Sequence, residues 1–286
     1  MASQVADYEI TGTVLDDSVV PCLRARHPQR LGGGDGPVTI WILGPLARAP
    51  WAAARARFEL LAGVRNQNLP EWLEAGTGEW AQRPVIWVSA STPVIGTLAS
   101  APPEMGMPAK LRAVAAAARG AHALHDKGQL HGAICPQAVA LVAGGAEAQA
   151  TSFIPGPLAV IPVGNAVLAP PPLADGERPV AQVGYPPLGY MDPQLLRGEG
   201  GRWSDIWALG ATVRQVSTGS VPFPGIDDLP VVQALAQLLM APVPAPAQVP
   251  AAVSELVRAC LDADPANRPA TASEVADRLD EAAAKW

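Results

Sequence analysis

The sequence predicts an α+β fold in which a small β-rich part precedes a larger, mostly α-helical part. Apolar and polar residues alternate over 8–26, and a glycine-rich turn separates that segment from a second strand-like run over 38–43. A short apolar run over 85–88 is typical of a buried strand, whereas helical spacing dominates in the later part of the chain. We therefore expect one domain built from two lobes, residues 1–91 and residues 92–286.

The helices are predicted from their spacing and their end signals. An Ala-, Arg- and Leu-rich helix is expected over 51–64, and an alanine-rich helix over 109–127. A helix over 205–218 follows Ser204, whose hydroxyl is suited to cap its first turn. The residues 271–274 have the spacing of a capping box, which predicts a terminal helix after them.

The composition excludes several classes of protein. Of the 286 residues 49% are hydrophobic, which suits a folded domain and not a disordered chain. The net charge of −6 argues against nucleic-acid binding, because such proteins need a broad basic face. Glutamines and prolines interrupt the apolar stretch 229–253, so we expect no membrane span, and residues 1–10 have no secretory signal pattern. These features predict a cytoplasmic protein.

The cysteines indicate neither a disulfide framework nor a metal site. Cys22, Cys135 and Cys260 are odd in number and lack the spacing of zinc ligands. His122 and His125 lie three residues apart on one expected helix, but no third ligand accompanies them. We therefore expect reduced thiols and no bound metal.

Four segments of the second part carry a specific pattern. They are GYMDPQ (189–194), SDIWALGA (204–211), PFPG (222–225) and DPANRP (264–269). Together they resemble the C-terminal lobe of a bacterial Ser/Thr protein kinase. Upstream, His131 to Ala138 resembles the kinase catalytic loop, and the strand 38–41 stands where that family has Val-Ala-Ile-Lys. The resemblance covers nearly the whole chain and implies the bilobal protein-kinase-like fold.

At the positions that hold ATP in this family, the chain carries unsuitable residues. The glycine-loop positions are taken by Leu15, Asp17 and Val20. Their side chains would block the approach of backbone N–H groups to phosphate, and an acidic residue there repels it. Trp41 replaces the phosphate-binding lysine with an uncharged indole that strand periodicity turns toward the family's cleft. The helix glutamate that pairs with this lysine aligns with Arg57, or with Glu59 in a shifted register.

The catalytic positions are also degenerate. Ala133 replaces the proton-accepting aspartate, Cys135 the lysine and Ala138 the metal-binding asparagine. At the Asp-Phe-Gly position the sequence has Ser152, which is a poor ligand for Mg²⁺ by itself. The chain therefore lacks, in several places at once, the groups that phosphoryl transfer needs.

Other family positions keep residues that hold the fold together. They are Leu61, His131, Phe153, Asp205 and Arg268. In the kinase arrangement Asp205 receives backbone N–H groups of the catalytic loop. Arg268 is expected to meet Gln194, where the family has Glu, in a neutral hydrogen bond that is weaker than an ion pair.

These two sets of residues indicate a pseudokinase without cofactor or metal. We expect a non-catalytic domain that binds another protein as a scaffold or allosteric regulator, within a bacterial phosphorylation-linked signalling assembly, with its nucleotide pocket occluded. The proline-rich segment 155–187 stands at the activation-loop place, where it would dock on the domain itself or on a partner.

Two alternatives stay open. The first is a switch that binds ATP without Mg²⁺ through backbone contacts of residues 89–91 beside an open pocket at Trp41. The second is an atypical phosphotransferase, for which Asp16, Asp17 or Glu59 would have to supply the missing carboxylate.

Overall fold

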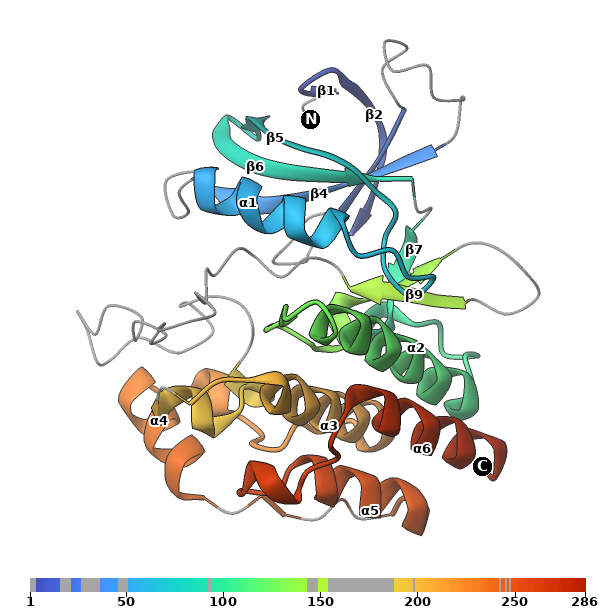
Figure 1. Ribbon diagram of the computed structural model, residues 1–286, viewed down its shortest axis with the longest axis vertical. Helices are drawn as coiled ribbons and strands as arrows, with labels where there is room; N and C mark the ends of the chain where they lie inside the picture. The colour runs from blue at the N-terminus through green and yellow to red at the C-terminus, as the bar shows by residue number, and fades with distance from the viewer. Residues whose placement is uncertain are drawn as a thin grey trace.

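The computed structural model describes residues 4–15, 22–26, 37–45, 51–91, 94–142, 149–153, 188–197, 199–241, 243–244, 246 and 248–286. The chain forms a β-rich lobe above a mostly helical lobe, with a second, small sheet between the large sheet and helix α2 (Figure 1). The predicted α+β class, with a β-rich lobe followed by a mostly helical lobe, is confirmed. None of the helices in the described ranges combines the length and the hydropathy that a membrane crossing needs.

The smaller lobe is a six-stranded antiparallel sheet with one helix. Its strands are β1 (Gln4–Val5), β2 (Tyr8–Leu15), β3 (Cys22–Arg26), β4 (Pro37–Pro45), β5 (Trp72–Trp80) and β6 (Arg83–Ala90), in the spatial order β1-β2-β3-β4-β6-β5. Helix α1 (Trp51–Ala62) contacts β5 (Figure 1). Both faces of the sheet are buried, so β6 reads as a continuous apolar run: Val85 and Trp87 lie in one core cluster, and Ile86 and Val88 in the other.

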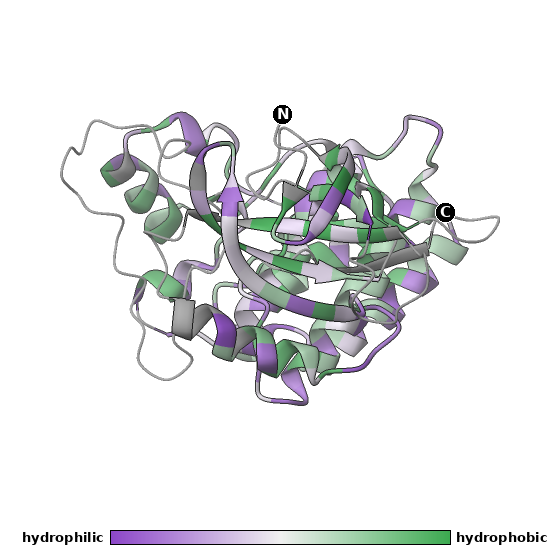
Figure 2. Ribbon diagram, turned by 90° about the horizontal axis from the view of Figure 1, so that it is seen from above, coloured by the Kyte–Doolittle hydropathy of each residue, from purple (hydrophilic) through white to green (hydrophobic). Residues whose placement is uncertain are grey.

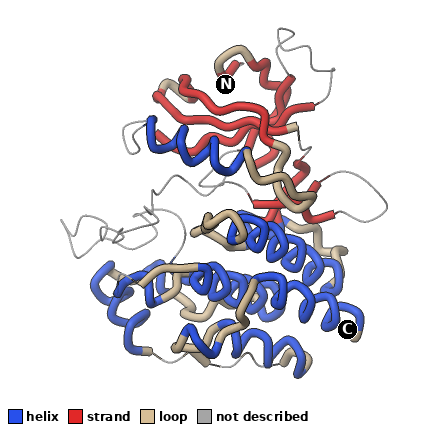
Figure 3. The backbone as a smooth tube through the Cα atoms, in the orientation of Figure 1, coloured by secondary structure: helices blue, strands red, loops and turns tan. Residues whose placement is uncertain are grey.

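The larger lobe consists of five helices and the small sheet in the described ranges. The strands β7 (Val94–Thr97), β8 (Val139–Val142) and β9 (Gln149–Phe153) pair antiparallel in that order. The helices are α2 (Met107–His125), α3 (Arg202–Thr218), α4 (Val231–Met240), α5 (Ala251–Cys260) and α6 (Ala272–Ala284). Helix α2 contacts α3, α6 and the small sheet, so it lies between the small sheet and the other helices of the lobe (Figure 3). Seen from above, the described ribbon carries both hydrophobic and hydrophilic residues (Figure 2). Helix α3 is buried all round over residues 204–214.

The N-termini of helices α3 and α6 test the capping residues predicted from the sequence. Helix α3 begins at Arg202, three residues before the predicted start, and Ser204 lies inside its first turn, where its hydroxyl accepts a hydrogen bond from the Gly201 N–H. The assignment of Ser204 as the capping residue is therefore wrong. The terminal helix α6 does begin after Thr271, whose hydroxyl accepts the N–H of Glu274 at 3.2 Å.

Candidate functional site

The position of the missing lysine lies at the centre of the large sheet. Trp41 pairs in register with Cys22 on β3 and with Val88 on β6. Its side chain is fully buried, at 0% exposure. Strand β4 thus places an indole where the resemblance expects an ammonium group.

An apolar, aromatic cluster surrounds this indole. The Trp41 and Trp72 rings meet edge to face with centroids 5.5 Å apart, and Phe58 of α1 meets Trp72 in the same way at 6.0 Å. The rest of the cluster is aliphatic or small: Val14, Cys22, Ala75, Ile86, Val88, Ala90, Val94 and Ala140. Within the described residues the indole N–H has no hydrogen-bond partner. The chemistry available here is that of a packed core, which cannot offset the charge of a polyphosphate.

The carboxylate of Glu59, on helix α1, does not reach Trp41. The Glu59 side chain is 61% exposed and pairs with Arg55 one turn earlier, with 2.9 Å between Nε and Oε1. Glu59 thus lies at the surface, and its assignment to the glutamate position of the family stays a prediction. Arg57 lies in α1, but its side chain is outside the described part of the structure.

The loop that resembles the catalytic loop is buried and apolar at its three degenerate positions. Ala133, Cys135 and Ala138 are all buried, and the last of these ends a short 3₁₀ turn, Pro136–Ala138, that leads into β8. No side chain at these positions can accept a proton from a hydroxyl or bind a metal ion in the way that the family's residues do.

Asp205, at the start of α3, organises this loop. Its carboxylate accepts the backbone N–H of His131 at 2.9 Å and of Gly132 at 2.8 Å, which is the contact that the resemblance implied. The ring Nε2 of His125 lies 2.8 Å from the same carboxylate. Burial alone would raise the pKa of Asp205, but the hydrogen bond and charge of His125, the charge of His131 and the Gly132 N–H outweigh it and lower that pKa. His131 itself is buried, and its Nδ1 accepts the N–H of Ala133.

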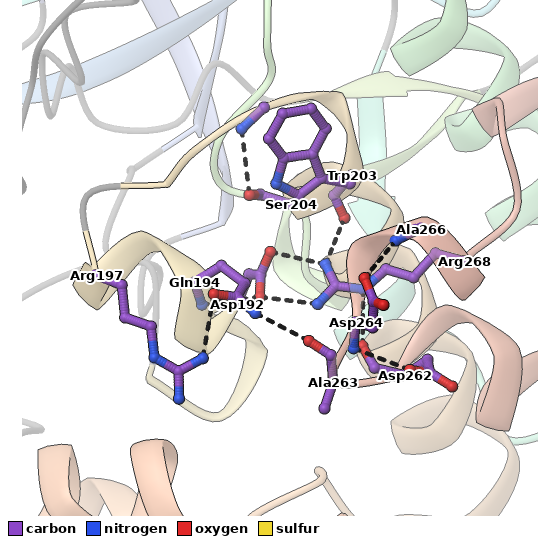
Figure 4. Close-up of polar contacts among 11 residues, drawn as sticks. Asp192, Gln194, Arg197, Trp203, Ser204, Asp262, Ala263, Asp264, Ala266 and Arg268 are labelled. Carbon is purple, nitrogen blue, oxygen red and sulfur yellow. Dashed lines mark hydrogen bonds and ion pairs between the residues drawn. The ribbon is translucent and has the colours of Figure 1, made fainter.

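The expected contact between Arg268 and Gln194 is wrong. The Arg268 guanidinium instead forms a two-pronged ion pair with Asp192, with N···O distances of 2.7 and 3.1 Å, and both side chains are almost completely buried (Figure 4). The guanidinium also donates to the backbone carbonyls of Trp203 and Asp262, and it lies 5.0 Å from the ring centre of Trp207.

The reason for this difference lies in the start of the 3₁₀ helix η7 (Pro193–Arg197). The Asp192 carboxylate accepts the N–H of Gln194 and so is held facing Arg268. A carboxylate binds guanidinium in a charged, bidentate geometry that an amide cannot match. Gln194 then donates to the Ala263 carbonyl at 2.9 Å and accepts from Arg197 at 3.1 Å (Figure 4). Arg268 thus has a carboxylate partner two residues before the position at which the resemblance expects one.

The remaining predicted positions are described only in part. Leu15 ends β2, and Ser152 and Phe153 lie in β9, but their side chains are outside the described part of the structure. Asp17, Val20 and the whole segment 155–187 are outside it altogether. Leu61 is half-buried against the core of the larger lobe. In the described ranges no three His, Cys, Asp or Glu side chains gather in a way that could hold a metal ion.

Sequence reasoning missed Asp192 and His125 as members of the buried polar network. Asp192 stands inside the quoted segment 189–194, where an acidic residue before a proline was the available signal. The sequence presents His125 only at a possible metal-ligand spacing from His122, and the pairing of His125 with Asp205 is a contact that only the fold shows.

Comparisons with known proteins agree with this architecture. The family model for protein tyrosine and serine/threonine kinases matches residues 57–279. Two relatives are a probable serine/threonine-protein kinase of Dictyostelium discoideum, 32% identical over 93 residues, and mitogen-activated protein kinase kinase kinase 19 of Mus musculus, 37% identical over 83 residues. These matches cover 32% and 28% of this chain but only 10% and 6% of the relatives.

Among solved structures, the fold matches the kinase domain of PknI from Mycobacterium tuberculosis. The TM-score is 0.62 and the match covers 99% of each chain, at 18% sequence identity. At that identity the likeness concerns the fold alone.

Proposed function

Because this chain belongs to the protein tyrosine and serine/threonine kinase family, we propose that it is a catalytically inactive member, a pseudokinase domain that acts in the cytoplasm as a binding scaffold or allosteric regulator of another protein. It transfers no phosphate, and its nucleotide pocket is closed by its own side chains. The proposal concerns this domain and not any longer protein that contains it.

The observation that carries the proposal is the burial of Trp41. A kinase needs a cation here to pair with the α- and β-phosphates of ATP. This chain has an indole at 0% exposure, in contact with the aromatic ring of Trp72. Binding of ATP in the family's way would require the indole to leave its core and a polyphosphate to enter an apolar cluster, and both steps are unfavourable.

The buried catalytic loop supports the same proposal. Ala133 and Ala138 offer no carboxylate or amide for the attacking hydroxyl or for Mg²⁺, and Glu59 is held at the surface by Arg55. A change at one position would leave the others unable to act. We therefore expect that no single substitution restores phosphate transfer.

The intact frame around α3 supports a role in binding. Asp205 and Arg268 make buried, charged contacts that fix the loops of the larger lobe, although those loops carry no catalytic side chains that would need to be positioned. A fold whose surface loops are held in place, and whose reactive groups are gone, suits recognition of a partner protein.

A phosphate-transfer assay tests the loss of catalysis. The wild-type domain is incubated with γ-labelled ATP, Mg²⁺ or Mn²⁺, and a generic acceptor protein, beside the variant Trp41→Lys/Asp17→Gly, whose folding is checked by thermal unfolding. We expect no labelled product from either protein, because Ala133 and Ala138 still lack the family's functional groups. Transfer by the wild type would overturn the proposal, and transfer by the double variant would show that the catalytic loop is misassigned.

A binding assay tests the scaffold role. Immobilised wild-type domain is compared with Arg268→Ala, which is expected to disrupt the larger lobe, for capture of purified candidate partner proteins, measured by interferometry. Partner binding that needs the intact fold and persists without nucleotide supports the scaffold. Binding that appears only with ATP would favour the nucleotide-dependent switch instead.

A further inference from the structure

A short connector, residues 91–93, joins β6 of the large sheet to β7 of the small one. Because all of β1 to β6 precede it in the chain, this connector is the covalent link between the lobes. Hinges of this kind absorb the backbone rotation when domains open and close. The contacts at its two ends therefore decide whether the lobes can move.

At its first end the connector is held by the residue that precedes β5. The N–H of Ser91 donates to the backbone carbonyl of Glu71 at 3.0 Å. The Ser91 hydroxyl donates to the carboxylate of the same residue at 2.7 Å. Both the backbone and the side chain of Ser91 are thus attached to the large sheet.

At its second end the connector is held by Thr39 on β4. The N–H of Val94, the first residue of β7, donates to the Thr39 hydroxyl at 3.3 Å. Both residues are 3% exposed, so water does not compete for this hydrogen bond. The bond joins the large sheet to the small one directly, because Val94 pairs with Val142 of β8.

Apolar contacts between the sheets reinforce this attachment. Val14 and Trp41 of the large sheet belong to the same packed cluster as Val94 and Ala140 of the small sheet, and strand β2 contacts β7. Opening the lobes would expose this cluster to water, at about 25 cal/mol for each Å² of apolar surface.

We propose that the contacts of Ser91 and Val94, the described residues on either side of 92–93, hold the two lobes in one fixed arrangement. Thr39 and Glu71 are the pinning residues, and Trp41 packs in the apolar cluster that joins the two sheets. The inference goes beyond the proposed function, because it makes the domain a rigid module whose shape no nucleotide regulates.

The experiment measures the distance between the lobes by electron paramagnetic resonance. Spin labels are attached at Thr77→Cys on β5 and Arg112→Cys on α2, two exposed positions, since the three native cysteines are buried. The pinning variant Thr39→Val/Glu71→Ala removes both side-chain acceptors. The matched control Thr11→Val/Glu59→Ala makes the same changes at exposed positions of the same lobe.

We expect one narrow distance distribution for the wild type and the control, unchanged by millimolar ATP with Mg²⁺. The pinning variant is expected to broaden it, and hydrogen exchange at the Val94 amide is expected to accelerate by about fivefold or more. Two populated distances in the wild type, or a pinning variant as narrow as the control, would overturn the inference. Phosphate transfer by a domain that keeps a single narrow distribution would instead contradict only the proposed function.

Discussion

The surroundings of Trp41 and those of Asp205 differ in whether they contain buried charged groups. Around Trp41, where the resemblance expects charged groups, the structure has a buried aromatic and aliphatic cluster. Around Asp205 and Arg268 the buried charges remain, each with hydrogen-bonding partners. Charges that served only chemistry are exchangeable for apolar packing, whereas charges that satisfy buried backbone groups are difficult to remove singly.

The displaced ion pair sharpens this difference. Gln194 stands where the family has its carboxylate, yet Asp192 supplies one to Arg268 from a neighbouring position. Arg268 therefore has a buried carboxylate partner although the expected position holds an amide. No comparable replacement for the lysine at Trp41 is found among the described residues that surround the indole.

The largest expected effect comes from breaking the buried ion pair. Asp192→Ala leaves the Arg268 guanidinium buried without its carboxylate, and we expect a loss of about 3–5 kcal/mol in the free energy of unfolding. Urea denaturation measures it. The exposed pair between Glu9 and Arg26 is the control, and Glu9→Ala should cost below about 1 kcal/mol. Equal losses in the two variants would mean that burial does not distinguish these pairs.

Removal of the Trp41 indole should lower the free energy of unfolding almost as much. A small molecule should restore part of this lost stability. Trp41→Ala is expected to lose about 3–5 kcal/mol and to leave an apolar cavity in the cluster around Trp72. Free indole should fill this cavity and raise the melting temperature of the variant, but not that of the wild type. Trp286→Ala, at the partly exposed C-terminal residue, is the control. Stabilisation of Trp41→Ala by ATP and not by indole would show a nucleotide site beneath the indole.

A smaller effect is expected where α3 and α5 approach most closely. A Cβ at Gly210 would come within 2.4 Å of the Cβ of Cys260, so Gly210→Ala should lose about 1–3 kcal/mol through overpacking. Gly12 is the control, because a Cβ there meets nothing within 4 Å. A thermal denaturation series compares the two. If Gly210→Ala is as stable as Gly12→Ala, the helices are not packed as described.

The smallest effect comes from pH, which leaves every side chain in place. The pKa of Asp205 is lower in the folded protein than in the unfolded chain, so its carboxylate contributes stability above its ordinary pKa. That contribution should disappear as the pH falls below about 5 toward the lowered pKa. Urea midpoints across this range should fall more steeply for the wild type than for Asp205→Asn. Parallel curves would show that Asp205 titrates normally.

Much of the fold could be predicted because its elements carry local signals. Strands β2, β3, β4 and β6 show alternating or continuous apolar residues, and the segments 189–194 and 264–269 have a specific spacing. Strand β5 was missed, because Gly76 and Gly78 weaken its pattern. Their lack of side chains leaves room for the Trp87 indole, which a Cβ at Gly76 would approach within 2.5 Å.

The site could be predicted only where residue identity decides the chemistry. The absence of a lysine at Trp41 follows from the sequence, since no conformation gives an indole a positive charge. The partner of Arg268 does not follow from it, because the choice between Asp192 and Gln194 depends on which side chain the turn before η7 directs inward. Helix α4 was also missed, because its uncharged residues were read together with the proline-rich connector after it.

The measurement that tests the central claim most directly is a thermal-shift titration of the wild-type domain with ATP and ADP, with and without Mg²⁺ or Mn²⁺, followed by calorimetry. A ligand present at 100 times its dissociation constant stabilises a fold by about 2.7 kcal/mol, which such a titration detects readily. We expect no shift at millimolar nucleotide, because Trp41 lies in a packed apolar cluster at the position where the family is expected to bind phosphate. A saturable shift confirmed by calorimetry would contradict it, and its dependence on metal would separate a nucleotide switch from an active kinase.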